Sequence, residues 1–263
     1  MSISIDMIKQ LRDATLAPLG DCKEALVEAN GDLELAKEIL KKKGAIKADK
    51  KADRETNNGI VRFVVSDDTV VGIKLLCETD FVAKNEAFGA LVDSLVSATA
   101  QYAGDVDPEQ VPADLMDTLQ TLVKDQAVTI GEAMKIAYVY KTKAHAYAYN
   151  HGGSLSSVVF YDGSDDEVAK TVALQVAAMN PLFVSIDDVP TDRIAQLKSE
   201  FAADESLANK PENIRDQIVE GKVQKAVQDD ILLEQVSIKD QSKKIKELLP
   251  AGFVVKSFLR VSI

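Results

Sequence analysis

The sequence has no tryptophan, two cysteines and two histidines among its 263 residues. Two cysteines exclude a disulfide-rich scaffold and a zinc site with four thiolate ligands, and two histidines argue against a multi-histidine metal centre. Aromatic residues make up 5% of the chain, so Ala, Val, Leu and Ile must fill the core. No apolar run approaches the roughly 20 residues of a membrane-spanning helix, and no targeting signal is visible. We therefore expect a cytoplasmic protein without a membrane partner.

The charge of the chain is strongly negative. Lys and Arg number 31 and Asp and Glu number 42, which gives a net charge of −11. Such a chain is a poor candidate for coating DNA or an anionic membrane, and we expect no direct nucleic-acid binding. Residues 41–54 are the exception, because six Lys and one Arg against two Asp give this stretch a net charge of +5. The stretch is either a solvated helix end and linker, which the pattern favours, or a contact for a nucleic acid or another acidic partner.

The first 55 residues have the pattern of a small helical module. Apolar residues at helical spacing predict three short helices, with turns at residues 18–20 and 30–32. Asp32 is expected to cap the third helix at its start. The lysines at positions 41–43 favour a helix end there, and Gly44 follows as the residue just beyond that end.

After this module the pattern changes to strands and helices. The β-rich runs at residues 60–65 and 70–77 predict a hairpin. Apolar residues between positions 88 and 96 recur at the spacing of an amphipathic helix. A looser helical pattern covers residues 108–126, and residues 133–149 are predicted to form one strand.

The second half of the chain repeats this order. A strand is predicted at residues 155–161, followed by a capping box at 164–167 that opens a helix to Met179. Two helices between positions 187 and 230 are predicted to form an antiparallel hairpin, a short helix follows near Ile245, and the chain ends in a strand. The repeat indicates an internal duplication.

We therefore predict an α+β fold with a helical module and a core of two related halves. The expected domain boundaries are 1–55 for the module with its basic linker, 56–140 for the first half of the core and 141–263 for the second half. The helical hairpin, at about residues 187–230, is an insertion in the second half.

Residues that could carry out chemistry are scarce. The chain has neither a Gly-x-Gly-x-x-Gly motif nor a phosphate-binding loop, so we expect no nucleotide or other cofactor and no catalytic residue. Paired acids at positions 67–68, 165–166, 187–188 and 229–230 could bind a metal, but their positions favour turns and helix starts, and no metal site is predicted. His145 is expected to be a strand residue, and Cys22 and Cys77 are expected to be small buried apolar residues.

The segment 78–85 differs from the rest, because it places Asp80 beside Phe81 between a strand end and a strong helix. Two interpretations are open for this phenylalanine. It could fold back into the core and fasten the following helix, or it could project as an apolar plug for a partner, with the charge of Asp80 beside it. The pattern alone favours the core, because a loop phenylalanine is more often buried.

This segment resembles the signature of a known family. Thr79-Asp80-Phe81-Val82-Ala83-Lys84-Asn85 is similar to the signature of the elongation factor Ts family. Further similarities to that family follow the same order along essentially the whole chain: Leu11-Arg12, Asp21-Cys22-Lys23-Glu24-Ala25-Leu26, Asn30-Gly31-Asp32-Leu33-Glu34, Gly44-Ala45-Ile46-Lys47-Ala48, Ile130-Gly131-Glu132, His151-Gly152-Gly153, Lys210-Pro211-Glu212-Asn213-Ile214 and Ile218-Val219-Glu220-Gly221-Lys222. The chain departs from the family pattern at Leu16 and Pro18, where glycines are usual.

The resemblance implies a fold and a function. The fold is an N-terminal ubiquitin-associated-like module of three helices, followed by two related antiparallel-sheet α+β subdomains with a projecting helical hairpin. The function is guanine-nucleotide exchange on elongation factor Tu. A member of this family binds elongation factor Tu in its GDP-bound and nucleotide-free forms, promotes GDP release by disturbing the partner's magnesium site, and changes no covalent bond.

The resemblance also implies the residues that contact the partner. Thr79, Asp80, Phe81 and Val82 would intrude beside the magnesium site of elongation factor Tu, and Arg12, His151 and Gly152 would make other contacts. The helical hairpin could support a homodimer, as in some relatives. Two other classes of function remain open: a helical adaptor or RNA-binding protein that acts through residues 41–54, and an enzyme that uses the paired acids.

Overall fold

The computed structural model describes residues 3–15, 17–51, 54–204 and 211–263. The chain forms two compact units: the first contains Met1–Ala144, Asn150–Leu155 and Val261–Ile263, and the second contains His145–Tyr149 and Ser156–Arg260. The three-part division predicted from the sequence stays a prediction. Among the helices of the described ranges, none combines the length and the apolarity needed to cross a membrane.

Three helices form the N-terminal module, as the sequence predicted: α1 (Ile5–Thr15), α2 (Leu19–Glu28) and α3 (Leu33–Lys51). Asp32 caps α3 as expected, because its Oδ1 atom accepts hydrogen bonds from the amides of Glu34 and Leu35 at 2.9 and 3.0 Å. The helices enclose a small core of Leu11, Ala17, Cys22, Ala25, Leu26, Ala29, Ala36 and Leu40.

The start of α2 and the end of α3 differ from the prediction. Pro18 does not begin a turn but is the N-cap of α2, where its missing N–H costs nothing, and Gly20 lies inside that helix. Leu16 lies outside the described residues. Gly44 does not end α3, which continues to Lys51. An internal glycine costs only about 1 kcal/mol, and the surrounding Ala and Lys are strong helix formers.

Helix α3 packs against α6 (Ala113–Ile130). Lys41 Nζ lies 2.8 Å from Asp125 Oδ1, and Gly44 is buried. Most of the basic stretch is therefore helix rather than linker. The side chains of residues 45–53 lie outside the described part of the chain, so the contact predicted for them stays a prediction.

The first sheet contains β1 (Asn58–Ser66), β2 (Thr69–Cys77) and β3 (Met134–Lys143), in the antiparallel order β1-β2-β3. The predicted hairpin is confirmed, and Asp67 and Asp68 adopt φ angles of 49° and 54° in its two-residue turn. Such positive angles match the right-handed twist of the flanking strands, and Asp tolerates them. The first pair of acids is therefore used in a turn.

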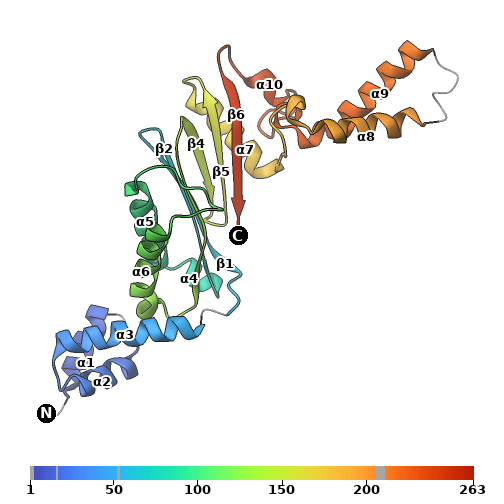
Figure 1. The fold of residues 1–263 in the computed structure, drawn as a ribbon. Helices are drawn as coiled ribbons and strands as arrows, with labels where there is room; N and C mark the ends of the chain where they lie inside the picture. Colours follow the sequence, from blue (N-terminus) through green and yellow to red (C-terminus); the bar gives the residue numbers. More distant parts are fainter. Residues whose placement is uncertain (1–2, 16, 52–53, 205–210) are drawn as a thin grey trace. The chain divides into compact units, whose positions relative to one another are not determined.

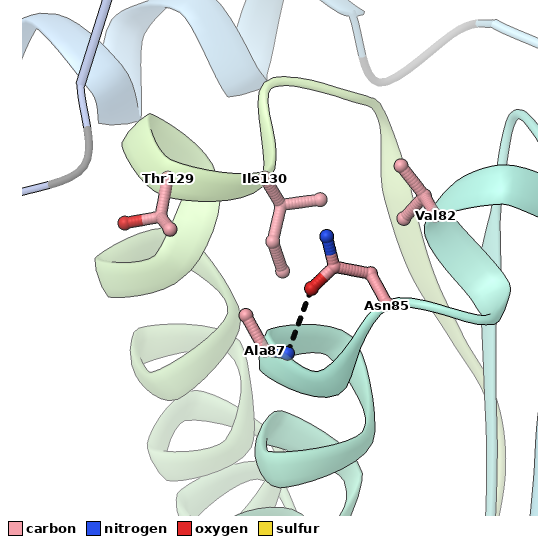
Figure 2. Close-up of a pocket in the computed structure, with 5 residues that line it drawn as sticks. All are labelled: Val82, Asn85, Ala87, Thr129 and Ile130. Atoms are coloured by element: carbon pink, nitrogen blue, oxygen red, sulfur yellow. Dashed lines mark hydrogen bonds between the residues drawn. The ribbon is translucent and has the colours of Figure 1, made fainter.

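Two helices, α5 (Glu86–Gln101) and α6, accompany this sheet (Figure 1). Asn85 caps α5, because its Oδ1 atom accepts a hydrogen bond of 2.8 Å from the amide of Ala87 (Figure 2). The helix α6 starts at residue 113 rather than 108. Pro112 explains this difference, because a proline disfavours helical geometry in the residue before it.

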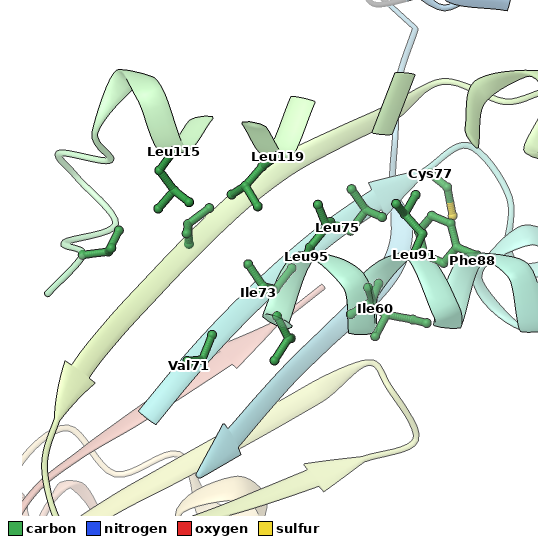
Figure 3. Close-up of a cluster of buried hydrophobic side chains, with 14 residues drawn as sticks. Ile60, Val71, Ile73, Leu75, Cys77, Phe88, Leu91, Leu95, Leu115 and Leu119 are labelled. Carbon is green, nitrogen blue, oxygen red and sulfur yellow. The ribbon is translucent and has the colours of Figure 1, made fainter. Parts of the chain in front are cut away.

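A second core in the first unit, separate from that of the N-terminal module, lies between this sheet and the two helices (Figure 3). The apolar face predicted for α5 is confirmed, since Phe88, Leu91, Val92, Leu95 and Val96 are all buried. They pack with Ile60, Val71, Ile73, Leu75, Cys77, Val106, Leu115, Leu119 and Val139. Lys141 is also buried, and its ammonium donates to the carbonyl oxygens of Ala100 and Tyr102 at the end of α5.

The segment 133–149 is not one strand. It divides into β3 and β4 (Ala146–His151), which belong to different sheets, and His145 lies between them rather than inside a strand. Side chains alternate between the two faces with a period of two residues in β3 and in β4 alike. The sequence pattern therefore does not reveal where β3 ends and β4 begins.

The second sheet contains β4, β5 (Leu155–Asp162) and β6 (Val254–Ser262) in the order β4-β5-β6. Helix α7 (Asp166–Met179) follows its hairpin, as α5 follows the first hairpin. Its cap is Asp165, one residue later than predicted, and the carboxylate accepts from the amide of Val168 at 3.0 Å. The same order of hairpin, helix and closing strand confirms two similarly built α+β halves.

The predicted helical hairpin consists of α8 (Thr191–Ala202) and α9 (Glu212–Val227), which lie side by side (Figure 1). Apolar residues from both helices form their contact: Ile194, Leu197, Phe201, Ile218, Val219 and Val223. Residues 205–210 lie outside the described ranges, and self-association through this hairpin stays a prediction. Short 3₁₀ turns cover Ile186–Asp188, Gln228–Asp230 and Leu232–Glu234, and α10 covers Ile245–Leu248.

Candidate functional site

The segment that carries Asp80 and Phe81 is a single helical turn, α4 (Asp80–Ala83), between the end of β2 and the start of α5. We call residues 79–82 the Phe81 turn. Thr79 caps α4, because its Oγ1 atom accepts a hydrogen bond of 3.3 Å from the amide of Val82. This cap sets the direction in which each side chain of the short helix points.

Phe81 lies on the outer side of this turn and is 82% exposed. The expectation that it folds back into the core is therefore wrong. Val82 and Ala83 are the residues that pack against the core cluster, so they fasten the following helix in its place. A large aromatic side chain left in water is unusual and marks a candidate contact for a partner.

Asp80 is held in its ionised form beside this ring. Its Oδ2 atom lies 2.7 Å from the Nζ atom of Lys84, one helical turn later. The hydrogen bond from this ammonium, and then its charge, hold the pKa of Asp80 below the usual value. The Phe81 turn therefore presents an apolar ring and a carboxylate side by side at neutral pH.

Two glutamates fasten the base of the turn. Glu132 accepts hydrogen bonds from the amide of Thr79 at 2.9 Å and from its hydroxyl group at 2.6 Å. Glu78 accepts one from the amide of Ala133 at 2.7 Å, and the guanidinium of Arg54 lies 3.2 Å from the same carboxylate. The Phe81 turn is thus tied to the segment between α6 and β3.

A pocket of about 210 Å³ lies beside the turn (Figure 2). Its lining is neutral and comes from Val82, Asn85, Ala87, Thr129 and Ile130. It is smaller than the roughly 300 Å³ at which ligand pockets usually begin, and it offers no charged group to a phosphate. The pocket therefore gives no support to a small-molecule site. The exposed Phe81 turn beside it is the more distinctive feature.

Cys77 lies just before the turn and is fully buried, as the sequence predicted for both cysteines. Its Sγ atom donates to the carbonyl oxygen of Thr79 at 3.2 Å. Burial raises the pKa of the Cys77 thiol to about 11 and also raises that of Cys22. Since the thiolate is the nucleophile, both residues should be unreactive in the folded protein at neutral pH.

We predict that Ellman's reagent labels neither thiol of the native protein within minutes at about pH 8. Raising the pH should speed the labelling of Cys77 until the pH approaches its pKa, because more thiolate then forms. Both thiols should react at once in guanidinium, and a Cys77→Ala variant assigns the two signals. Rapid labelling of the native protein at the lower pH would contradict this prediction.

The other residues predicted to contact the partner lie on separate elements. Arg12 is exposed in the last turn of α1. His151 and Gly152 are exposed at the turn between β4 and β5, which we call the His151 turn. Gly152 has a φ angle of 56° there. The structure thus brings together residues 79–82, whereas Arg12 and the His151 turn are placed elsewhere on the first unit.

The His151 turn is anchored to the edge of β1. The side-chain amide of Asn150 donates to the carbonyl oxygen of Phe63 and accepts from its backbone N–H, both at 2.9 Å. The carbonyl oxygen of Gly153 accepts from the amide of Val61 at 2.7 Å. These bonds pair backbone groups of β1 and hold the turn in a defined place.

Sequence reasoning missed the residues that support the Phe81 turn. Lys84 could have been found, because residues four apart on a helix face each other and opposite charges there attract. Glu132 lies 53 residues from Thr79, and no local pattern links two segments so far apart. Its presence in the motif Ile130-Gly131-Glu132 was the available signal.

Comparison with known proteins identifies the family. The family model described as "Elongation factor TS" matches residues 78–263. The chain is 37% identical over 271 residues to "Elongation factor Ts" of Hydrogenobaculum sp. (strain Y04AAS1), with 100% of this chain and 99% of the relative covered. It is 37% identical over 285 residues to the protein of the same name from Aquifex aeolicus (strain VF5), with coverage of 100% and 98%. The chain belongs to the elongation factor Ts family.

Proposed function

We propose that this protein binds elongation factor Tu in its GDP-bound and nucleotide-free forms and accelerates the release of GDP, so that GTP can bind. Membership of the family supports this function, and so does the exposed ring of Phe81, 82% accessible on a capped and anchored turn. The proposed activity is exchange by binding alone, so no covalent bond is made or broken. The observation that carries the proposal is this exposed ring beside an ionised carboxylate.

The mechanism is a negative coupling between two ligands of elongation factor Tu. A magnesium ion on the partner bridges the diphosphate to the protein and neutralises its charge. The Phe81 turn, residues 79–82, would enter beside this ion, displace its surroundings and weaken the hold on GDP. Because linkage is reciprocal, bound GDP must weaken the hold on the exchange factor by the same factor. The complex that holds GDP and the exchange factor together is therefore the unstable one, and it releases one of the two.

A large acceleration of GDP release requires more than one contact with elongation factor Tu. A thousandfold faster release corresponds to about 4 kcal/mol of the barrier. Burial of one phenylalanine supplies roughly 1.5–3 kcal/mol. The rest would come from a wider interface, for which we propose Arg12 on α1 and the His151 turn with Gly152. Both are exposed, and the bonds of Asn150 and Gly153 keep the His151 turn in place.

The test is the release of fluorescent GDP from purified elongation factor Tu, with and without catalytic amounts of this protein. We expect strong acceleration that saturates with the concentration of the protein. Binding without acceleration would reject the role of the Phe81 turn and leave only docking. No binding at all would reject the function and favour an adaptor or RNA-binding role for residues 41–54, whose RNA binding would weaken with salt.

A further inference from the structure

We propose that Glu132 is a positioning residue for nucleotide exchange, because its carboxylate holds the Phe81 turn in the geometry that enters the partner. The inference rests on the proposed function, since it assigns a role within the same site. Glu132 itself is half-buried and lies behind the turn, so it acts through Thr79.

The first observation is a continuous path of hydrogen bonds from Glu132 into α4. One carboxylate oxygen accepts from the amide of Thr79, and the other accepts from its hydroxyl group. The same hydroxyl oxygen accepts from the amide of Val82. Glu132 therefore orients the cap of the helix whose second residue is Phe81. Hydrogen bonds to an ionised acceptor are about twice as strong as neutral ones.

The second observation is that the clamp continues the register of the sheet. The β2–β3 ladder ends with Cys77 opposite Met134. In that register Ala133 is opposite Glu78, and Glu132 is opposite Thr79. At both positions a glutamate carboxylate accepts from the amide of the opposite residue, where a backbone carbonyl would do so inside the ladder. The side chains thus extend the pairing of two strands to the start of the Phe81 turn.

The turn needs this support because it is short. A helix of four residues cannot hold itself together, since the first turn fixes several dihedral angles for one hydrogen bond. Phe81 cannot help, because its ring is in water in the free protein. A turn already ordered by Glu132 loses less conformational entropy when it binds, and this lowers the barrier for insertion.

The test is Glu132→Gln, which keeps the shape of the side chain but replaces one acceptor oxygen with an NH₂ group. We expect the hydrogen-exchange protection of the Thr79 and Val82 amides to fall about tenfold or more. The maximal rate of GDP release should fall by a similar factor, while the half-saturating concentration changes less than about twofold. A residue that served only global stability would not separate these two parameters.

The controls use matched substitutions. Glu167→Gln removes the same charge from an exposed glutamate at the start of α7, and it should leave exchange and protection unchanged. Thr79→Val removes the hydroxyl group that links Glu132 to Val82, and it should resemble Glu132→Gln. The double variant Glu132→Gln, Thr79→Val should be hardly slower than either single variant, because all three break one network.

Two results would overturn the proposal while the wild type is active. One is Glu132→Gln with the maximal rate of the wild type. The other is unchanged protection of the Thr79 and Val82 amides in that variant. If the wild type itself does not accelerate GDP release, the proposed function fails and so does any role of Glu132 in exchange. The amide protection then reports separately whether the clamp orders the turn.

Discussion

Phe81→Ala should slow the catalysed release of GDP about 10- to 100-fold and leave the free energy of unfolding within about 0.5 kcal/mol of the wild type. The kinetic loss is expected because the ring would become buried only in the complex with the partner. The stability should not change because the ring is 82% exposed in the free protein. The measurement combines stopped-flow release of fluorescent GDP with urea unfolding of each variant.

Leu182→Ala is the matched control for this prediction. Leu182 is 55% exposed but lies in the second unit, outside the proposed site. Its truncation should change neither the exchange rate nor the stability. Asp80→Ala, like Phe81→Ala, should lose most of the exchange activity, because it removes the charge beside the ring. Equal loss in Leu182→Ala and Phe81→Ala, or unfolding of Phe81→Ala, would contradict the assignment.

Phe88→Ala, unlike Phe81→Ala, should destabilise the protein and lower its free energy of unfolding by about 3–5 kcal/mol. This phenylalanine is fully buried in the first turns of α5 and packs in the core cluster with Cys77 and Leu91 (Figure 3). The loss combines the transfer of the ring to water with the cavity that remains. Phe88→Leu fills more of that space and should cost much less.

The measurement is denaturant unfolding of the wild type and both Phe88 variants. We expect the midpoint to move to lower denaturant with an unchanged slope, which indicates altered stability rather than an altered unfolded state. A loss below about 1 kcal/mol for Phe88→Ala would mean that this site can collapse around the missing ring. It would also contradict the view that Phe88 is central to the core beside the first sheet.

The two phenylalanines show where sequence patterns stop being informative. They are seven residues apart, and both have apolar neighbours. Phe88 belongs to a repeating helical pattern, and its burial was predicted. Phe81 belongs to no repeat, and the pattern favoured burial, whereas the cap on Thr79 and the packing of Val82 leave its ring in water.

The elements themselves could be read from the amino-acid order because they depend on neighbours in the chain. Asp32, Asn85 and Asp165 cap helices through amides two or three residues away. The turn at Asp67 and Asp68 and the apolar face of α5 are equally local. These short-range preferences were enough to predict the helical module, the β1–β2 hairpin, the helical hairpin of α8 and α9, and the α+β class.

Features that join distant segments required the three-dimensional arrangement. Helix α3 packs on α6, which lies far from it in the sequence, and the break between β3 and β4 separates two sheets with the same alternation. The bond of Glu132 to Thr79 crosses 53 residues. Each of these outcomes depends on which surfaces meet when the chain is packed. The amino-acid sequence by itself therefore marks the Phe81 turn as a candidate site. The exposure of the Phe81 ring and the support from Glu132 arise from tertiary contacts between segments that no local pattern connects.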